Sequence, residues 1–184
     1  MGEKSKIWFT SDTHFGAERT LNMSKRPFKT VEEMDETIIS NWNSVVGESD
    51  IVYHLGDFGD YKVAEKLNGK IVLVCGNYEM CETKKVIDNA LLFDSIFAGS
   101  TSIDINYCRE DFHINMSHEP SLIKKYDISN NQINLFGHIH KLCMVKRFGI
   151  NVGMDCHNFY PIDMRTVLFY HNGILHYYDY EVFN

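Results

Sequence analysis

Long apolar runs and paired cysteine motifs are both missing from the sequence. No stretch approaches the roughly 20 consecutive apolar residues of a membrane-spanning helix, so no membrane association is expected. The five cysteines are odd in number and form no C-x-x-C pair, which excludes a disulfide framework and is typical of reduced thiols in a soluble cytoplasmic protein. Residues 1–5 are short and polar and lead directly into an apolar run, so we expect no signal peptide.

Basic residues are also scarce. The 18 lysines and arginines are outnumbered by 25 aspartates and glutamates, which gives a net charge of -7. A general nucleic-acid-binding surface would need a broad excess of basic side chains, and this composition argues against one. It leaves room for phosphate chemistry at a metal site, because bound cations would be the largest local charges there. Since the sequence shows no repeat or linker, one domain is expected over residues 1–184.

Three short apolar runs in the first half each lead into a polar side chain. They are residues 6–11, 51–55 and 71–75, and the polar residues that follow are Asp12, Asp57 and Asn77. Runs this short and rich in β-branched residues are typical of strands buried on both faces at the centre of an α/β sheet. Because ligands of such sheets bind at the carboxyl ends of the strands, the three polar side chains are predicted to meet.

Helical patterns separate these runs. A capping box at residues 30–33 begins a helix that is expected to extend to Val46, and shorter helices are predicted at about 61–68 and around 86–91. Residues 15–29 are expected to form a polar loop. The alternation of strand and helix indicates a parallel sheet with right-handed crossovers.

The pattern changes to short strands after the first half. Residues 101–108 and 111–117 are predicted to form a hairpin, followed by a strand at 132–136. Further short strands are predicted in residues 142–154 and 164–180, the last pair turning at the Asn-Gly dipeptide 172–173. The expected fold class is α/β, a sandwich of two sheets packed face to face and flanked by helices.

Seven side chains just after predicted strands carry oxygen or imidazole nitrogen. They are Asp12, His14, Asp57, Asn77, His118, His138 and His140. Each alone is ordinary, because a single strand-end aspartate is usually a turn residue and a single histidine usually packs in a core. Together they supply enough ligands for two divalent cations if one carboxylate bridges them. Asp57 is the best candidate for the bridging carboxylate, because it follows the middle of the three parallel segments.

Two pairs of these residues are separated by one position, Asp12 with His14 and His138 with His140. Residues spaced in this way share one face of a strand, so both side chains of a pair can reach the same site.

The motifs, in this order, resemble those of the calcineurin-like metallophosphoesterases, and the small size resembles their compact single-domain bacterial, archaeal and phage members. The matching segments are Asp12-Thr13-His14, Gly56-Asp57-Phe58-Gly59-Asp60, Gly76-Asn77-Tyr78, His118, and Gly137-His138-Ile139-His140. The resemblance implies a two-sheet α/β sandwich that hydrolyses phosphomonoesters or phosphodiesters.

The resemblance also implies roles for the seven side chains. One cation would be held by Asp12, His14 and His140, and the second by Asn77, His118 and His138, with Asp57 as the bridge. A hydroxide shared by the cations would attack phosphorus, so no protein nucleophile is required. Nitrogen and oxygen ligands without cysteine suit manganese, iron, nickel or zinc, and the family preference for manganese or iron makes manganese the expected metal.

Tyr78 is a departure from the family pattern. Many members have histidine directly after Gly-Asn, credited with protonating the leaving group, whereas a phenol with a pKa of ~10 is a poor proton shuttle at neutral pH. We therefore favour phosphodiesters over phosphomonoesters, since an activated diester needs less proton donation. The predicted catalytic residues are Asp57, Asn77, Tyr78 and His118. The alternative function is a catalytically weak or inactive scaffold that binds proteins.

Substrate contacts are predicted from three further residues. Arg19 and Arg26 lie in the loop after His14, and a guanidinium group matches phosphate oxygens, although for each residue by itself a solvated loop is the favoured explanation. His157 follows the last ligand motif and is expected on the same rim, either touching substrate or on the surface. The expected partner is a small-molecule or nucleotide phosphoester. The sequence leaves the oligomeric state open, and a homodimer is one expectation because compact members of the family often form dimers.

Overall fold

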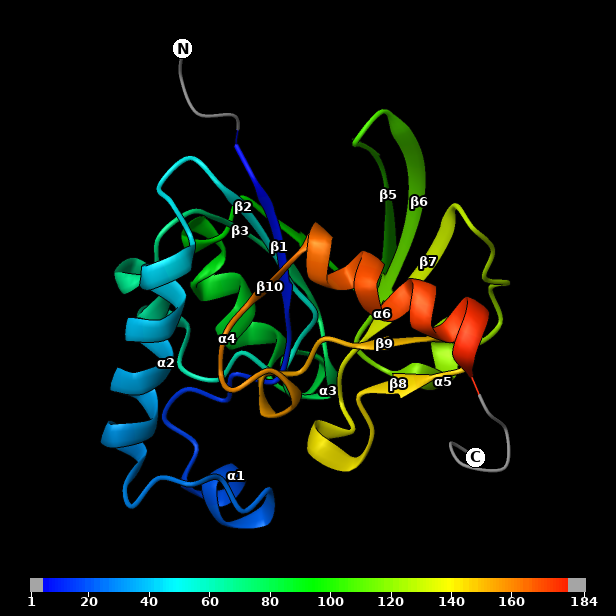
Figure 1. Cartoon of the computed structure of the whole chain (residues 1–184). Coiled ribbons are helices and arrows are strands. Elements are labelled where there is room, and N and C mark those ends of the chain that lie inside the picture. The colour runs from blue at the N-terminus through cyan, green and yellow to red at the C-terminus, as the bar shows by residue number, and fades with distance from the viewer. Residues whose placement is uncertain (1–4, 179–184) are drawn as a thin grey trace.

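The first of two five-stranded sheets is mostly parallel, as predicted (Figure 1). The computed structural model describes residues 5–178. The strand order is β10-β1-β2-β3-β4, with β10 antiparallel to β1 and the other pairs parallel. The strands are β1 (Ile7–Thr10), β2 (Ile51–His54), β3 (Lys70–Val74), β4 (Ser95–Phe97) and β10 (Ile162–Asp163).

The second sheet contains the predicted hairpin. Its order is β5-β6-β7-β9-β8, and β5 and β6 pair antiparallel while β7 is parallel to both β6 and β9. The strands are β5 (Ser100–Tyr107), β6 (Glu110–Ser117), β7 (Gln132–Phe136), β8 (Val145–Lys146) and β9 (Gly149–Asn151). The two-sheet α/β sandwich with flanking helices is therefore confirmed.

Helices cover the sheets, with α2 beside the first sheet and α6 crossing the molecule in front of β9 in Figure 1. The α-helices are α1 (Glu18–Met23), α2 (Val31–Val45), α3 (Asn77–Cys81), α4 (Thr83–Asp88), α5 (Pro120–Ile123) and α6 (Met164–Tyr177). Short 3-10 helices are η1 (Tyr61–Lys66), η2 (Ala90–Leu92), η3 (His140–Leu142) and η4 (Met154–Cys156). Within residues 5–178, no helix has the length and apolar character needed to cross a bilayer.

Two apolar cores hold these layers together. The α2 helix starts where predicted, because the Thr30 hydroxyl accepts a hydrogen bond from the Glu33 amide, and it buries Met34, Ile38 and Trp42 against the first sheet. The second core joins the two sheets and α6. It includes Phe9 and Leu55 from the first sheet, Ile114 and Leu135 from the second, and Val167 and Ile174 from the helix. Burial on both sides fixes the carboxyl edge of each strand relative to the other sheet.

The prediction of strands in residues 164–180 is wrong, because α6 occupies Met164–Tyr177. The Asp163 carboxylate accepts a hydrogen bond from the Thr166 amide and caps the helix. Burial of Met164, Val167, His171 and Ile174 follows the spacing of a helix rather than a strand. The helix passes through the Asn-Gly dipeptide at 172–173 without turning, and residues 179–180 of the predicted strand lie outside the described residues. The predicted loop at 15–29 likewise contains α1.

Replacing Gly173 by alanine tests the helical assignment. We expect Gly173→Ala to raise the free energy of unfolding by about 0.5–1 kcal/mol, because alanine favours a helix over glycine. An added Cβ would meet no atom within 4 Å. Urea denaturation measures the change. Gly99→Ala is the control, since that site is equally open but has a φ of +91° and should lose stability. A loss of stability in Gly173→Ala would instead support a hairpin turn.

Candidate metal centre

All seven side chains expected at the metal site come from loops at the carboxyl edge of the two sheets. Asp12 and His14 follow β1, Asp57 follows β2, and Asn77 begins α3 just after β3. From the second sheet, His118 follows β6, and both His138 and His140 follow β7. The parallel pairing of β1 with β2, of β2 with β3, and of β6 with β7 brings these loops to neighbouring positions.

Asp12, His14 and His140 form one group of ligand atoms. Each offers one atom, and these atoms all lie within 4.8 Å of one another. The imidazole rings of His14 and His140 stack with their centroids 5.2 Å apart, and His14 Nε2 lies 3.9 Å from Asp12 Oδ1.

Asn77, His118 and His138 form a second group. His118 Nε2 lies 2.9 Å from Asn77 Oδ1, and His138 Nδ1 lies 3.1 Å from the same oxygen and 3.2 Å from His118 Nε2. His118 Nδ1 lies 2.7 Å from the Leu55 carbonyl, so Nδ1 carries the proton and Nε2 faces the site with its lone pair. With the Asn77 oxygen and His118 Nε2 both acceptors, only His138 Nδ1 can carry a proton into this group, and it can donate that proton to one of them.

Asp57 lies between the two groups. Its Oδ2 atom is 3.5 Å from His14 Nε2 and 3.5 Å from His118 Nε2. Its Oδ1 atom accepts a hydrogen bond from the Tyr78 amide at 3.0 Å. Burial raises the pKa of Asp57 to about 6, a cost that a positive charge beside the carboxylate would offset.

The surroundings of His14 fit a bound cation. The residue is 1% exposed, and neither ring nitrogen has a hydrogen-bond partner among the described residues. Burial lowers the pKa of His14 to about 3, so the imidazole is neutral at physiological pH and can donate a lone pair. An unpaired buried nitrogen is costly, and a divalent cation accepts nitrogen and oxygen donors of this kind.

The backbone of this edge is held in an uncommon conformation. Five of the seven residues have φ in the left-handed region, namely Asp12 (58°), His14 (52°), Asp57 (57°), His138 (73°) and His140 (48°). Such strain gathers at functional sites, where the surrounding structure maintains it. Here the Asp12 amide donates to the Gly56 carbonyl at 3.0 Å, and the His14 amide donates to the Asp57 carbonyl at 3.0 Å.

Glu79 holds the loops that carry the ligands, and the sequence analysis did not predict this role. Its buried carboxylate accepts hydrogen bonds from the amides of Asp57 (2.8 Å), Phe58 (2.9 Å) and Gly76 (2.8 Å). The carboxylate therefore ties the loop after β2 to the start of α3. A glutamate three residues after a strand-end glycine is a capping-box signal that could have identified it.

Arg26 occupies a different place from the one predicted. It is 5% exposed, and its Nε and Nη2 atoms donate to the Asp155 carboxylate at 3.0 and 2.8 Å. Nη1 also donates to the Thr13 carbonyl at 2.8 Å, and Nη2 to the Asp12 carbonyl at 2.5 Å. Since protein groups take these donors, the predicted contact with substrate does not fit, and Arg26 instead supports the loop that carries Asp12.

Asp155 connects this arginine to a metal-site histidine. Its Oδ2 atom lies 2.9 Å from His140 Nδ1, which leaves His140 Nε2 for a ligand. Burial acts to raise the pKa of Asp155, but hydrogen bonds from His140 and Arg26 outweigh it and lower the pKa to about 2. The carboxylate therefore stays ionised and holds the imidazole in one orientation.

The remaining predicted residues differ in position. His157 is buried, so the expected surface position is wrong, and its Nε2 lies 2.8 Å from the Asn151 carbonyl, where it is hydrogen-bonded within the protein. Arg19 is exposed on α1, and its contact with substrate stays a prediction. The ring of Tyr78 meets the His14 ring edge to face with centroids 4.8 Å apart, so this phenol adjoins the site.

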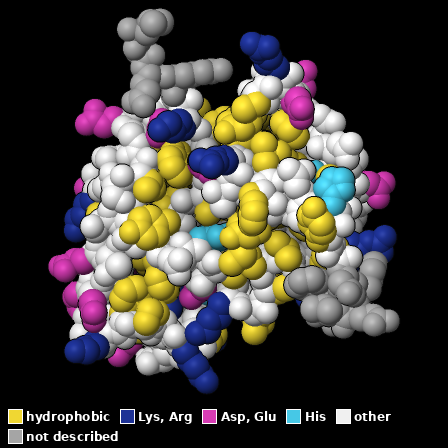
Figure 2. Space-filling model, viewed as in Figure 1, with side chains coloured by type: hydrophobic (Ala, Val, Ile, Leu, Met, Phe, Trp, Pro, Cys, Tyr) yellow, Lys and Arg dark blue, Asp and Glu magenta, His cyan; other side chains and the backbone are white. Residues whose placement is uncertain are grey.

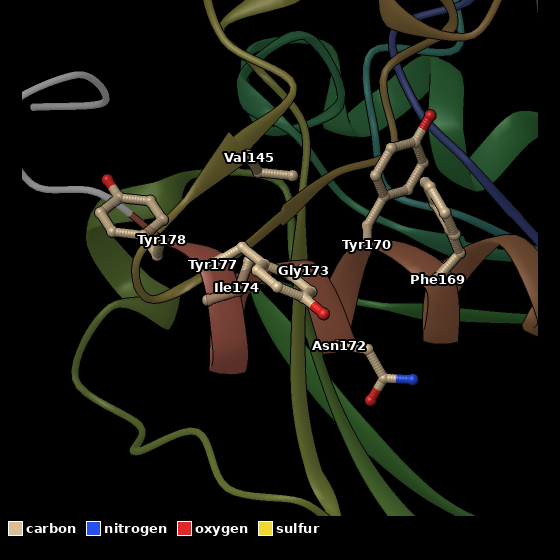
Figure 3. Close-up of a pocket in the computed structure, with 8 residues that line it drawn as sticks. All are labelled: Val145, Phe169, Tyr170, Asn172, Gly173, Ile174, Tyr177 and Tyr178. Atoms are coloured by element: carbon tan, nitrogen blue, oxygen red, sulfur yellow. The ribbon is translucent and has the colours of Figure 1, made fainter.

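An apolar hollow on the outer side of α6 lies apart from these residues (Figure 3). It has a volume of about 400 Å³, and its lining includes Val145, Phe169, Ile174 and Tyr177. Hydrophobic side chains are also visible over α6 in Figure 2. None of the predicted site residues lines this hollow, so it is separate from the candidate metal centre.

Comparison with known proteins gives a family match and a relative of similar length. Residues 6–167 match the model of the calcineurin-like phosphoesterase superfamily domain. An uncharacterized protein of Methanocaldococcus jannaschii, MJ1445, is 32% identical over 173 residues, which cover 89% of this chain and 89% of the relative.

Two solved structures are also similar. The protein of unknown function AQ665 from Aquifex aeolicus has a TM-score of 0.66 at 23% identity, covering 89% of this chain and 98% of that one. An archaeal phosphodiesterase has a TM-score of 0.40 at 24% identity, covering 80% of this chain and 82% of that one.

Replacing Glu79 by glutamine tests its supporting role. We expect Glu79→Gln to lower the free energy of unfolding of the metal-free protein by about 1–3 kcal/mol, because the amide NH₂ would face a backbone N–H donor. Chemical denaturation in the presence of a chelator measures the loss. The control is Glu82→Gln, which removes only a surface pair with Lys85 and should change stability by less than about 0.5 kcal/mol. Equal effects in both variants would contradict the role of Glu79.

Proposed function

The chain belongs to the calcineurin-like phosphoesterase superfamily, and on this premise we propose that it is a dinuclear metal-dependent phosphodiesterase. The observation that carries the proposal is the convergence of imidazole nitrogens with carboxylate and amide oxygens, above all at His14, whose ring nitrogens have no hydrogen-bond partner among the described residues, and in the close group of Asn77, His118 and His138. Nitrogen and oxygen donors gathered in this way are the ligand types that divalent transition metals take in proteins.

The proposed ligand sets follow the two groups of atoms. Asp12, His14 and His140 would hold one cation, and Asn77, His118 and His138 the other. Asp57 would bridge, because one of its oxygens is equally far from a histidine of each group. When bound, the cations supply Lewis acidity that lowers the pKa of a water molecule and neutralises charge on the phosphoryl oxygens.

The chain's own residues keep these donors in the required protonation states. The Leu55 carbonyl holds the proton of His118 on Nδ1, and the Asp155 carboxylate does the same for His140. Both histidines therefore present Nε2 to the site. No side chain is needed as a nucleophile in this scheme.

Tyr78 favours diesters as substrates. It follows Asn77 directly, its backbone amide donates a hydrogen bond to the Asp57 carboxylate, and its ring lies against the His14 ring. The phenol can donate a hydrogen bond to a phosphoryl oxygen but is a weak proton donor to a poor leaving group. We therefore propose small-molecule or nucleotide phosphodiesters, with manganese as the metal and iron, nickel or zinc as alternatives. The five free cysteines agree with a reducing cytoplasmic location.

A scaffold without catalysis is the competing function, favoured by the absence of histidine at position 78. Elemental analysis of the purified protein and turnover of bis-nitrophenyl and mono-nitrophenyl phosphate with added Mn²⁺ separate the two. We expect metal binding and faster hydrolysis of the diester. Two bound metals per chain without turnover of either ester would favour the scaffold.

Replacing the proposed bridge tests the dinuclear arrangement. We expect Asp57→Asn to lower the rate on bis-nitrophenyl phosphate by at least about 100-fold, because the amide cannot supply a bridging negative charge. The fold should persist, since the asparagine oxygen can still accept from the Tyr78 amide. The control is Asp60→Asn in the same loop, where asparagine caps η1 equally well. Metal content is measured for both variants, and a wild-type rate in Asp57→Asn would rule out the bridge.

Replacing Tyr78 by histidine tests whether position 78 lies beside the leaving-group oxygen of the substrate. We expect Tyr78→His to raise the rate on diesters with poor leaving groups about tenfold relative to nitrophenyl diesters, because imidazolium is the better proton donor. Tyr78→Phe is the control and should not improve poor leaving groups. Rates across a series of leaving groups measure the effect, and an unchanged ratio would place position 78 away from the leaving oxygen.

A further inference from the structure

A second hollow lies outside the metal centre, between the segment after α5 and the turn from β8 to β9. It has a volume of about 570 Å³, within the usual range of small-molecule sites. Lys124 and Tyr126 line it from the first segment, and Lys146, Arg147 and Phe148 line it from the turn. We call it the basic hollow. None of the seven proposed metal ligands is among its lining residues.

The two segments carry the same short sequence pattern. Lys124-Lys125-Tyr126 and Lys146-Arg147-Phe148 are each a basic pair followed by an aromatic residue. Every residue of the two copies except Lys125 lines the one hollow, where Asp127 is the acidic residue of the lining. A concentration of cations on a chain with a net charge of -7 marks this place as a local anion site.

One buried amide ties the two segments together. The Asn134 side chain, fully buried in β7, donates hydrogen bonds to the Tyr126 carbonyl at 2.9 Å and the Phe148 carbonyl at 2.8 Å. Its oxygen accepts from the Asn115 amide at 3.0 Å. A Cβ at Gly149 would lie 2.6 Å from the Asn134 carbonyl, so only glycine allows this approach. The two aromatic residues are therefore fixed relative to each other.

The two aromatic rings pack against other side chains and are still accessible from the hollow. The Phe148 ring packs on Phe136 with centroids 5.6 Å apart and still lines the hollow. Tyr126 is 37% exposed, and Lys125 Nζ lies 5.2 Å from the centre of its ring. Aromatic faces beside lysines suit a planar ring that carries a phosphate, because the ring stacks while the phosphate pairs with the cations.

We propose that the basic hollow binds a phosphorylated nucleoside, either as a free nucleotide or as one residue of a single strand. Lys124 and Lys146 pair with the phosphate, and Tyr126 or Phe148 stacks on the base. This binding is independent of the metal centre and of whether that centre hydrolyses phosphodiesters.

Calorimetric titration of the full chain in a chelator tests the ligand class. The probes are adenosine monophosphate, adenosine, inorganic phosphate and a short single-stranded oligonucleotide. We expect saturable binding of the nucleotide below about 1 mM, with adenosine and phosphate each at least tenfold weaker. A still tighter oligonucleotide would identify a strand as the ligand, and equal affinity would identify the free nucleotide. Absence of saturable nucleotide binding, or equal binding of adenosine, would overturn the proposal.

Variants place the binding in the hollow. Lys124→Glu with Lys146→Glu should raise the Kd for the nucleotide at least tenfold. The control is Lys62→Glu with Lys84→Glu, which makes the same change of charge at exposed positions of η1 and α4 and should leave the Kd within about twofold. Phe148→Leu keeps an apolar contact with Phe136 but removes the stacking face, so the Kd should rise several-fold. Equal Kd values in the two double variants, with thermal melts showing both folded, would overturn the assignment.

Discussion

The close approach of imidazole nitrogens to carboxylate and amide oxygens at one buried edge is the constraint on which this structure depends. His14 has two ring nitrogens without a hydrogen-bond partner in a buried position, and His118 Nε2 lies 2.9 Å from Asn77 Oδ1. Such a cluster is unfavourable by itself and becomes favourable around divalent cations. At this one edge of the sheets the burial of ligand atoms without partners lowers stability, and a bound metal would offset that loss.

The surrounding residues hold the cluster open. Glu79, Arg26 and Asp155 are buried ionisable groups that support the loops carrying the donors. Glu79 accepts from backbone amides, Arg26 donates to backbone carbonyls, and Asp155 accepts from the His140 imidazole. These bonds maintain left-handed backbone at Asp12 and Asp57, which isolated loops would not keep. Hydrogen bonds from these neighbouring residues thus hold the donors in place, although the donors do not attract one another. The same device recurs in the basic hollow, where a buried amide fixes two surface segments.

Local sequence patterns predicted much of the fold for clear reasons. The strands around Phe9, Val52 and Ile71 and the helix capped at Thr30 depend on residues close in the chain, and the structure contains them. The Asn-Gly signal at 172–173 failed because a turn propensity of two residues is small beside the burial of a whole helix face. Arg26 and His157 were misplaced for a related reason, since polarity alone does not say whether water or protein meets a side chain.

The sequence by itself determined which donors were available and that they stood after strands, because the period of apolar residues and the chemistry of each side chain are local properties. It also determined the family, through the order and spacing of the motifs. The meeting of these donors and the bridging place of Asp57 were predictions from the sequence, and only the tertiary structure supplied the distances between donors that follow β1, β2, β3, β6 and β7. Only the tertiary structure showed that Arg26 and Asp155 act on His140. These facts depend on the packing of two sheets, which joins residues more than a hundred positions apart and leaves no trace in local sequence.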